Sequence, residues 1–224
     1  MLYIIGTPIG NLEDITLRAL RILKEVDYIF AEDTRRALKL LNFYSIKKPV
    51  DSYNEHSSPK KIDKILSMLK DGKNIAYLSD AGMPVIADPG TELVNLCVEN
   101  NIEWDVIPGV SSVLTAIAAS GFYGNRFVFL GFMPRDKKRR RILRKIKEND
   151  MSDVYIFFES PERLVKTLND VYDILGNVEI FVARELTKVH QEYFKGTVKR
   201  ALERFSEGVR GEITVVLKVN HKKG

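Results

Sequence analysis

Short apolar runs alternate with amphipathic segments along almost the whole chain of 224 residues. The run 2–5 is typical of a buried strand, whereas segment 16–26 has leucines at helical spacing behind a threonine that can cap a helix. Segment 58–72 predicts a further helix, because a proline lies near its start and a glycine follows its end. This alternation favours a mostly parallel sheet with helices on both faces.

The alternation continues to the end of the chain, but the later strands follow one another more closely, which predicts a mixed sheet there. Strands are expected at residues 2–5, 27–33, 74–80, 103–107, 126–132, 153–159, 178–185, 190–197 and 212–219. Helices are expected at residues 16–26, 34–43, 58–72, 90–101, 110–121, 135–147, 161–176 and from Val198 onward.

The charge balance changes near Gly121 and Gly124, which punctuate the middle of the chain. Residues 1–124 have a net charge of −3, and residues 125–224 have a net charge of +8. We therefore expect two α/β domains, residues 1–121 with the mostly parallel sheet and residues 122–224 with the mixed sheet. The basic second domain is expected to meet a polyanion.

Composition excludes several classes of protein. The sequence is 45% hydrophobic and 29% charged, as in ordinary globular proteins, and no apolar run approaches the ~18–20 residues that cross a membrane. Nothing at the N-terminus reads as a secretory leader. Cys97 is the only cysteine and the three histidines are scattered, so we expect neither a disulfide within the chain nor a metal site. These features predict a cytoplasmic protein that does not bind a membrane.

Four expected strands of the first half end in unusual loops, where ligands of open α/β sheets bind. The loops are residues 6–11, 32–36, 79–90 and 108–112, and three of them are rich in glycine, proline and small residues. Residues 6–11 have neither the Lys-Ser/Thr pair of a P-loop nor the glycine spacing of a dinucleotide fold. Loops of this composition let the backbone approach a compact organic ligand, so a nucleotide-like cofactor fits better than a metal. Each loop taken alone reads equally well as a plain turn.

Several of these segments resemble one family when they are taken together. They are GTPIGNLEDITLRAL, AEDTR, YNEH, LSDAGMPVIADPG, IPGVSS, FFESPERL, ARELTKVHQE and GEITVV. The chain resembles the bacterial 16S ribosomal RNA 2′-O-ribose methyltransferase I family, of the tetrapyrrole methylase-like class, from residue 1 to about residue 216. The resemblance implies a two-domain homodimer with S-adenosylmethionine in the cleft between its domains. The methyl group would go to the ribose 2′-oxygen of cytidine 1402 (the RNA's own numbering) in 16S ribosomal RNA or the small ribosomal subunit.

The resemblance also implies particular binding residues. For the cofactor they are Gly82, Met83, Val85, Ile86, Ser111, Ser112, Phe158, Ala183 and Ile213. The apolar members of this set could equally be plain core residues, and the serines could merely cap a helix. The first loop has no basic residue, and S-adenosylmethionine has no phosphate. The resemblance places this loop at the methyl-transfer site and therefore implies that Pro8, Ile9, Gly10 and Asn11 lie on the substrate side.

The segment AEDTR has three readings. Glu32 and Asp33 stand where a dinucleotide fold places its ribose-binding acid, whereas the resemblance places them in the substrate cleft. Asp33 and Arg35 could also form a surface ion pair worth well under ~1 kcal/mol. If the segment lies in the cleft, Arg35 and Arg36 can hold phosphates through two parallel hydrogen bonds.

Methyl transfer to a ribose hydroxyl needs an oriented oxygen and a group that takes its proton. Glu32, Asp33, His56 of YNEH and Glu159 of FFES are the candidates, and the sequence does not rank them. A lone histidine such as His56 is more often a surface residue.

The basic segment 135–147 is a signal that is independent of any family. Nine of its thirteen residues are Lys or Arg, and Asp136 is its only acid. Ile142, Leu143 and Ile146 share one helical face, so the helix can dock while a basic face stays in solvent. Because a one-signed face repels itself, we expect it to bind RNA phosphates. The RNA-binding residues expected here are Lys138, Arg139, Arg140, Arg141 and Arg144.

Other functions stay open at this point. A related enzyme could methylate a tetrapyrrole or a protein, although a small tetrapyrrole gives no reason for the basic segment. The chain could also be a non-catalytic RNA-binding factor of ribosome assembly with a vestigial pocket. Calorimetry with S-adenosylmethionine separates this last case, because such a factor binds no cofactor.

Overall fold

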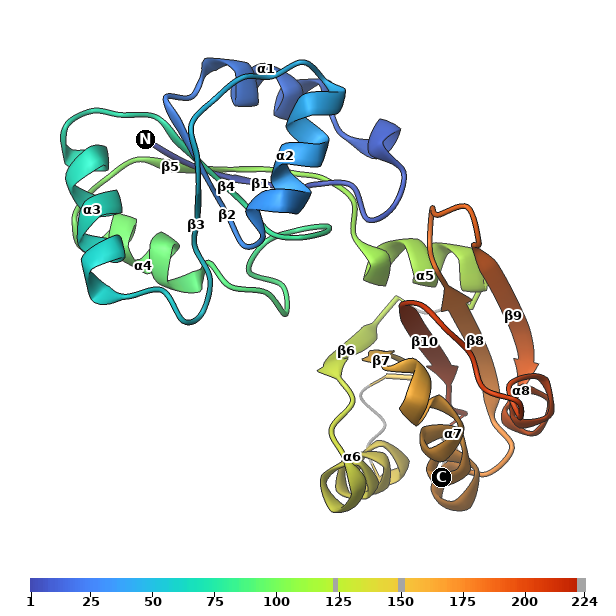
Figure 1. Ribbon diagram of the computed structural model, residues 1–224. Coiled ribbons are helices and arrows are strands. Elements are labelled where there is room, and N and C mark those ends of the chain that lie inside the picture. Colours follow the sequence, from blue (N-terminus) through green and yellow to red (C-terminus); the bar gives the residue numbers. More distant parts are fainter. Residues whose placement is uncertain (123–124, 149–151, 221–224) are drawn as a thin grey trace. The chain divides into compact units, whose positions relative to one another are not determined.

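The computed structural model describes residues 1–122, 125–148 and 152–220 (Figure 1). Gly124, near which the charge balance changes, and His221, one of the three histidines, lie outside these ranges. The chain forms two compact units, Met1–Ser111 and Ser112–Gly224. The division falls before helix α5 (Ser112–Ser120), whereas the sequence placed the domain boundary after it. Helix α5 goes with the second unit because it packs against three strands of that unit's sheet.

The first unit is built on a five-stranded sheet with the order β3-β2-β4-β1-β5, in which every neighbouring pair is parallel. Its strands are β1 (Leu2–Ile5), β2 (Tyr28–Ala31), β3 (Val50–Ser52), β4 (Ile75–Leu78) and β5 (Trp104–Ile107). The predicted parallel sheet is therefore confirmed. The edge strand β3 was not predicted, because it has only three half-buried residues and two of them are polar.

Helices cover both faces of this sheet (Figure 1). They are α1 (Leu17–Glu25), α2 (Thr34–Phe43), α3 (Pro59–Lys70) and α4 (Thr91–Glu99), with a short 3-10 turn η1 (Leu12–Asp14) before α1. Successive strand residues point to opposite faces. Ile29 of β2 accordingly packs with α1 and α2, whereas its neighbour Phe30 packs with α3 and α4. Thr16 caps α1 as predicted, and its hydroxyl accepts a hydrogen bond from the Ala19 amide at 3.1 Å.

The second unit has a mixed five-stranded sheet with the order β6-β7-β10-β8-β9. Strands β6 and β7 are parallel and the other neighbouring pairs are antiparallel, which confirms the predicted mixed sheet. The strands are β6 (Phe127–Phe132), β7 (Val154–Glu159), β8 (Glu179–Arg184), β9 (Glu192–Thr197) and β10 (Ile213–Lys218).

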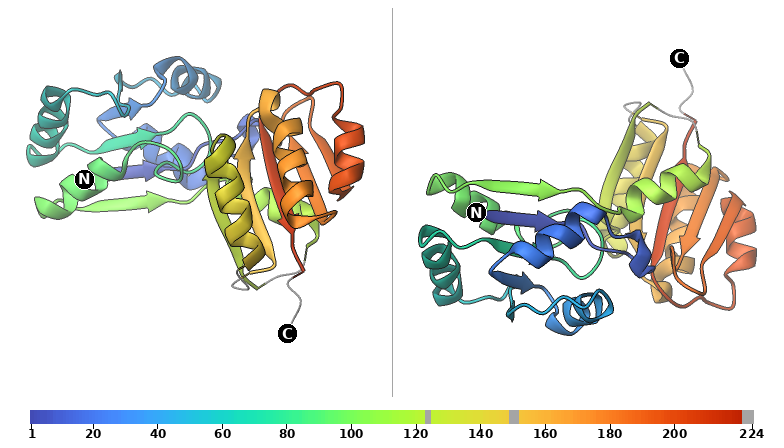
Figure 2. Two further views of the ribbon diagram at one scale, coloured as in Figure 1. Left: turned by 90° about the horizontal axis from the view of Figure 1, so that it is seen from below. Right: turned by 90° about the horizontal axis from the view of Figure 1, so that it is seen from above.

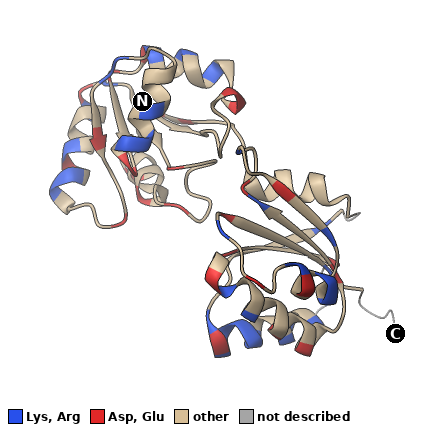
Figure 3. Cartoon of the chain, turned by 45° about the vertical axis from the view of Figure 1, so that its right-hand side comes forward, with Lys and Arg blue, Asp and Glu red and all other residues tan. Residues whose placement is uncertain are grey.

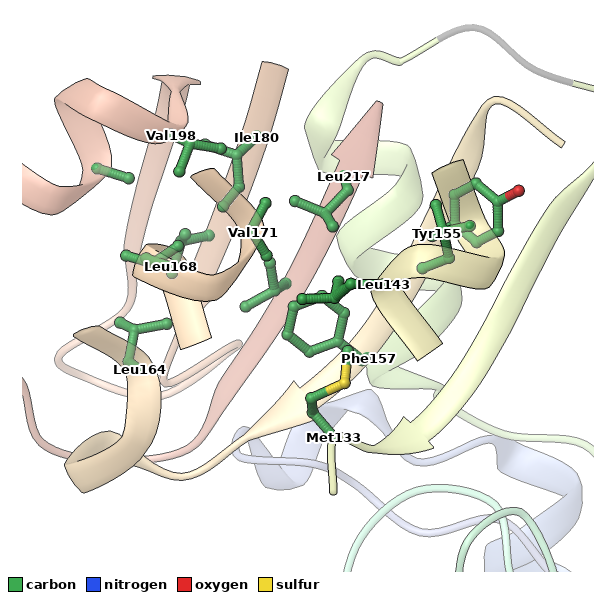
Figure 4. Close-up of a cluster of buried hydrophobic side chains, with 14 of the residues drawn as sticks. Met133, Leu143, Tyr155, Phe157, Leu164, Leu168, Val171, Ile180, Val198 and Leu217 are labelled. Atoms are coloured by element: carbon green, nitrogen blue, oxygen red, sulfur yellow. The ribbon is translucent and has the colours of Figure 1, made fainter. Parts of the chain in front are cut away.

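One face of this sheet carries helices α6 (Asp136–Glu148), α7 (Pro161–Leu175) and α8 (Val198–Arg204), and α5 lies on the other face (Figure 2). The main core of the unit lies under α6–α8. Leu143, Leu168 and Val198 from the three helices meet Phe157 and Leu217 from the strands, and all five are fully buried (Figure 4). No helix in the described parts of the chain is long and apolar enough to span a membrane.

Candidate functional site

The loops after β1 and β4 are held together by a short antiparallel bridge. The Thr7 amide donates to the Gly82 carbonyl at 2.8 Å, and the Gly82 amide donates back to the Thr7 carbonyl at 3.0 Å. Ile9 lies over the same glycine, since a Cβ built there would be 3.3 Å from Ile9 Cγ2. The carboxyl ends of these neighbouring parallel strands thus form one continuous surface.

The loop after β5 joins this surface through two glycines in close contact. A Cβ on Gly6 would lie 2.7 Å from the Gly109 Cα, and one on Gly109 would lie 2.8 Å from the Gly6 Cα. Both distances are too short for any side chain, so only glycine fits at either position. The Gly109 amide also lies 3.2 Å from Met83 Sδ. Loops from β1, β4 and β5 therefore meet within one side-chain length.

The loop between β4 and α4 has a strained backbone. Gly82 has φ 82°, and the non-glycine residues Val85 and Ala87 have φ 73° and 62°. A left-handed conformation costs a non-glycine residue roughly 1–2 kcal/mol, and such strain clusters at ligand sites. The loop leaves Ile86 53% exposed, and Met83 is only partly buried.

The residues of these loops fit a cofactor without phosphate. Segments 6–11, 79–90 and 108–112 contain no Lys or Arg, whereas Asp80 and Asp88 lie within the middle one. The predicted cofactor residues offer half-buried or exposed apolar side chains beside backbone groups, and Ser111 and Ser112 are partly buried. Such a surface suits a neutral or cationic organic group and repels an anion.

Three acidic residues are linked by hydrogen bonds where β2 and β4 end. The Asp33 amide donates to Asp80 Oδ1 at 2.9 Å, and the Asp80 amide donates to Glu32 Oε2 at 3.3 Å. Arg36 Nε lies 3.5 Å from Asp80 Oδ2. Asp80 was not among the predicted site residues. It follows β4 as Glu32 follows β2, and the pairing of these two strands could have revealed it.

The two acids of AEDTR are in opposite electrostatic situations. Burial, and then the charge of Asp80, raise the pKa of Glu32 above its usual value. The Arg35 side chain and amide both donate to Asp33 and hold its pKa at about 2. Asp33 also caps α2, so its carboxylate stays ionised and already accepts hydrogen bonds within the segment. The Asp33–Arg35 ion pair that the sequence offered as an alternative is thus present. Two nitrogens of the Arg35 guanidinium donate to the Asp33 carboxylate.

The other two acid–base candidates lie elsewhere. His56 is exposed in the loop after β3, where its amide donates to Asn54 Oδ1 at 3.0 Å. Glu159 is buried at the end of β7, pairs with Arg163 and accepts hydrogen bonds from the Ser160 amide and the Thr167 hydroxyl. These contacts fasten α7 to β7 and occupy both carboxylate oxygens of Glu159. Its catalytic role stays a prediction.

Strand register shows which face of the sheet each predicted cofactor residue of the second unit lies on. Phe158 and Ala183 are both paired with Thr214, so the three side chains form a row on the face that carries α5. Ile213 instead pairs with Glu159 and belongs to the core under α6–α8. The neighbouring Thr214, which is 5% exposed and pairs with both Phe158 and Ala183, was not among the predicted residues. The alternation of side chains along β10 could have indicated it.

Predicted RNA-binding residues are not all available to a ligand. Arg139 is only 1% exposed, and its Nε lies 2.6 Å from Asp170 Oδ2. Arg140 pairs with the same carboxylate and also with Asp173. The expectation that Arg139 faces solvent is therefore wrong, whereas Arg140 is partly exposed but already paired with two carboxylates. Arg139 lies four residues before Leu143 and shares its buried face, where Asp170 of α7 compensates its charge.

In the loop after β1, the predicted substrate residues Pro8 and Ile9 are buried, whereas Gly10 and Asn11 are exposed. Asn11 Oδ1 accepts a hydrogen bond from the Glu13 amide at 3.1 Å and thereby caps η1. The exposed part of the loop is thus held in one conformation by its own cap.

Comparison with known proteins defines the class to which this fold and its loops belong. Residues 1–202 match the profile of the Tetrapyrrole (Corrin/Porphyrin) Methylases. Two solved structures share the fold, each covering 97% of this chain. A diphthine synthase has a TM-score of 0.72 and 12% sequence identity, and 90% of its own chain is covered. The uroporphyrin-III-C-methyltransferase from Thermus thermophilus has a TM-score of 0.67 and 18% sequence identity, and 93% of its own chain is covered.

Closer relatives narrow the class to one family. Ribosomal RNA small subunit methyltransferase I from Thermotoga maritima is 56% identical, over 96% of this chain and 97% of its own. The protein of the same name from Bacillus subtilis is 44% identical, over 97% of this chain and 74% of its own. The chain belongs to the ribosomal RNA small subunit methyltransferase I family, which confirms the predicted resemblance.

Proposed function

We propose that this chain transfers the methyl group of S-adenosylmethionine to the ribose 2′-oxygen of cytidine 1402 in 16S ribosomal RNA. Family membership supports the methyl transfer and the small-subunit RNA. The structural observation that carries the proposal is the contact between Gly6, Gly109 and Met83. It joins three loops into one surface without basic residues, beside the linked acids Glu32 and Asp80.

Gly82, Met83, Val85 and Ile86 would hold the cofactor, together with the serines at positions 111 and 112. When bound, S-adenosylmethionine supplies a methyl group that its sulfonium charge activates, and no metal is needed for this. The negative charges of Asp80 and Asp88 favour a cation at this surface. The tight packing of Gly6 against Gly109 fixes the backbone groups that orient the ligand.

Glu32 is the residue that we assign to take the proton from the ribose hydroxyl. Its raised pKa makes it a better proton acceptor than Asp33, which is held ionised by Arg35. The Asp80 amide orients one Glu32 oxygen and leaves the other oxygen for the substrate. The exposed residues Gly10 and Asn11 would contact the substrate.

The remaining parts of the proposal follow the expectations drawn from the sequence and its resemblance. We propose that the chain acts as a homodimer in the cytoplasm, on 16S ribosomal RNA alone or within the small subunit. Phe158, Ala183 and Ile213 are proposed cofactor residues of the second unit. Since the Ile213 side chain is buried in the core, its contribution would come from the backbone.

The test is a methylation assay with 16S ribosomal RNA and small ribosomal subunits that lack the modification. After incubation with isotopically labelled S-adenosylmethionine, nuclease digestion and mass spectrometry locate the label. We expect one methyl group on the ribose of cytidine 1402. Label on a base, or at another nucleotide only, contradicts the assignment. If calorimetry also detects no cofactor binding, the chain is a non-catalytic RNA-binding factor.

A further inference from the structure

The charged residues of helix α6 fall into two groups. Three of them are paired with helix α7. Asp136 lies 2.5 Å from Lys166 Nζ, and Arg139 and Arg140 share the carboxylate of Asp170. The only acid of the basic segment is thus used in the contact with α7. The charged residues of the segment that have no partner on α7 are therefore all of one sign.

Helix α6 carries six exposed cations without an acidic partner on α7, and we name this set the basic face. Figure 3 shows where Lys and Arg lie along the chain. The basic face consists of Lys137, Lys138, Arg141, Arg144, Lys145 and Lys147. None of the six forms an ion pair with any residue that the structure describes. Like charges three and four residues apart on a helix each cost roughly 0.2–0.5 kcal/mol, and the basic face contains several such pairs.

The helix that presents the basic face is firmly anchored. Leu143 and Ile146 are 0% and 3% exposed in the core of the unit, and Arg139 is held by a buried ion pair. A buried arginine that lost its partner would destabilise the fold by several kcal/mol, so α6 is fixed against α7. The six cations therefore stand on a rigid support and lose little backbone entropy when they bind a ligand.

We propose that the basic face of α6 binds RNA phosphates and that Arg139 and Arg140 do not. This inference rests on the proposed function, which supplies the RNA. Anionic lipid is the other polyanion to consider. A helix that binds a membrane surface needs apolar residues beside its cations. Here Leu143 and Ile146 are buried in the core, and the exposed positions from Lys137 to Lys147 are all Lys or Arg.

The size of the basic face suits a nucleic acid. From Lys137 to Lys147 the helix rises by about 15 Å at ~1.5 Å per residue. A duplex carries roughly one charge per 1.7 Å of its axis, so several phosphates lie within reach. Contacts to phosphates position an RNA without reading its bases. The basic face should therefore contribute equally to binding of the target and of unrelated RNA.

The test compares two triple variants of the full chain. R141A/R144A/K145A removes three cations of the basic face, and K199A/R200A/R210A removes three exposed cations of the same unit outside it. Binding of a fluorescent RNA hairpin is measured by anisotropy at several salt concentrations. Each lost phosphate contact lowers the salt slope by about 0.7–0.9, so for the first variant we expect a loss of about 2–3 in slope and about 100–500-fold in affinity at 0.1 M salt. The control should bind as the unaltered chain does.

Equal losses of RNA affinity in the two variants would show that only the net charge of the chain matters, and would overturn the proposal. Unchanged RNA binding in R141A/R144A/K145A would also overturn it. If that variant instead loses binding only to vesicles containing phosphatidylserine, the basic face binds lipid. Calorimetry with S-adenosylmethionine runs in parallel. Absent cofactor binding in the unaltered chain would contradict the proposed function, while the comparison of RNA affinities would still decide the role of α6.

Discussion

Substitution Gly6→Ala tests the contact on which the candidate site depends. The new Cβ would lie 2.6 Å from Met83 Sδ and 2.7 Å from the Gly109 Cα. The methionine side chain can move, but the Gly109 backbone can yield only if the loop after β5 shifts. Overpacking of this kind costs about 1–3 kcal/mol. At roughly 4 °C per kcal/mol for a unit of this size, the melting temperature should fall by about 4–12 °C.

The assay combines thermal unfolding with calorimetry of S-adenosylmethionine binding, and Gly72→Ala is the matched control. Gly72 has φ 80° and no atom within 4 Å of the place that a Cβ would take, so its substitution costs only the left-handed conformation, roughly 1–2 kcal/mol. Both variants should lose stability, but only Gly6→Ala should lower the cofactor affinity, by more than about tenfold, or ~1.4 kcal/mol. Gly6→Ala/Met83→Ala should not recover it. Cofactor affinity equal to that of Gly72→Ala would refute the placement of the site.

Three further substitutions test charges and buried polar groups. Glu32→Gln should lower the methylation rate about 10²–10⁴-fold with unchanged cofactor affinity. The pKa of Glu32 is raised in the folded chain, so the ionised carboxylate opposes folding above that pKa. Denaturation at pH 7 should therefore show that the Glu32→Gln variant is as stable as the unaltered chain or more stable. Asp170→Ala should cost about 3–5 kcal/mol in urea unfolding, whereas Arg139→Met/Asp170→Leu should cost much less. Tyr77→Phe should be neutral or raise the melting temperature, since the buried Tyr77 hydroxyl has no hydrogen-bond partner among the described residues; a clear loss would mean that the hydroxyl is used.

Most of the fold could be predicted because its elements have strong local signals. Helix α2 has the predicted bounds 34–43, and α3 lies between the expected proline and glycine. Strand β3 shows the limit of this approach. Its three residues have no apolar alternation, and the strand exists because it pairs with β2, a contact between distant parts of the chain. Pairing of this kind leaves no trace in so short a segment.

The candidate site was only partly predictable, because its missing members depend on register and on neighbouring helices. Glu32 was a candidate, but its partner Asp80 becomes visible only when β2 and β4 are known to be adjacent. Arg139 lies in a basic segment and was predicted to contact RNA. It is buried because Asp170 lies opposite it on α7. Counting charges in a helix therefore overestimates the cations available to a ligand.

The division of charge along the chain explains why phosphate contacts are to be sought on α6. Residues 1–124, which include the whole first unit, have a net charge of −3. That unit places Glu32 and Asp80 together and pairs Arg35 and Arg36 with acids. In the proposed reaction these acids would favour a cationic methyl donor and would repel the phosphates on either side of the target ribose. A chain that binds RNA must offset this repulsion with cations that are free of acidic partners. Among the described residues the basic face of α6 is a rigid set of such cations, so its loss should weaken RNA binding more than cofactor binding.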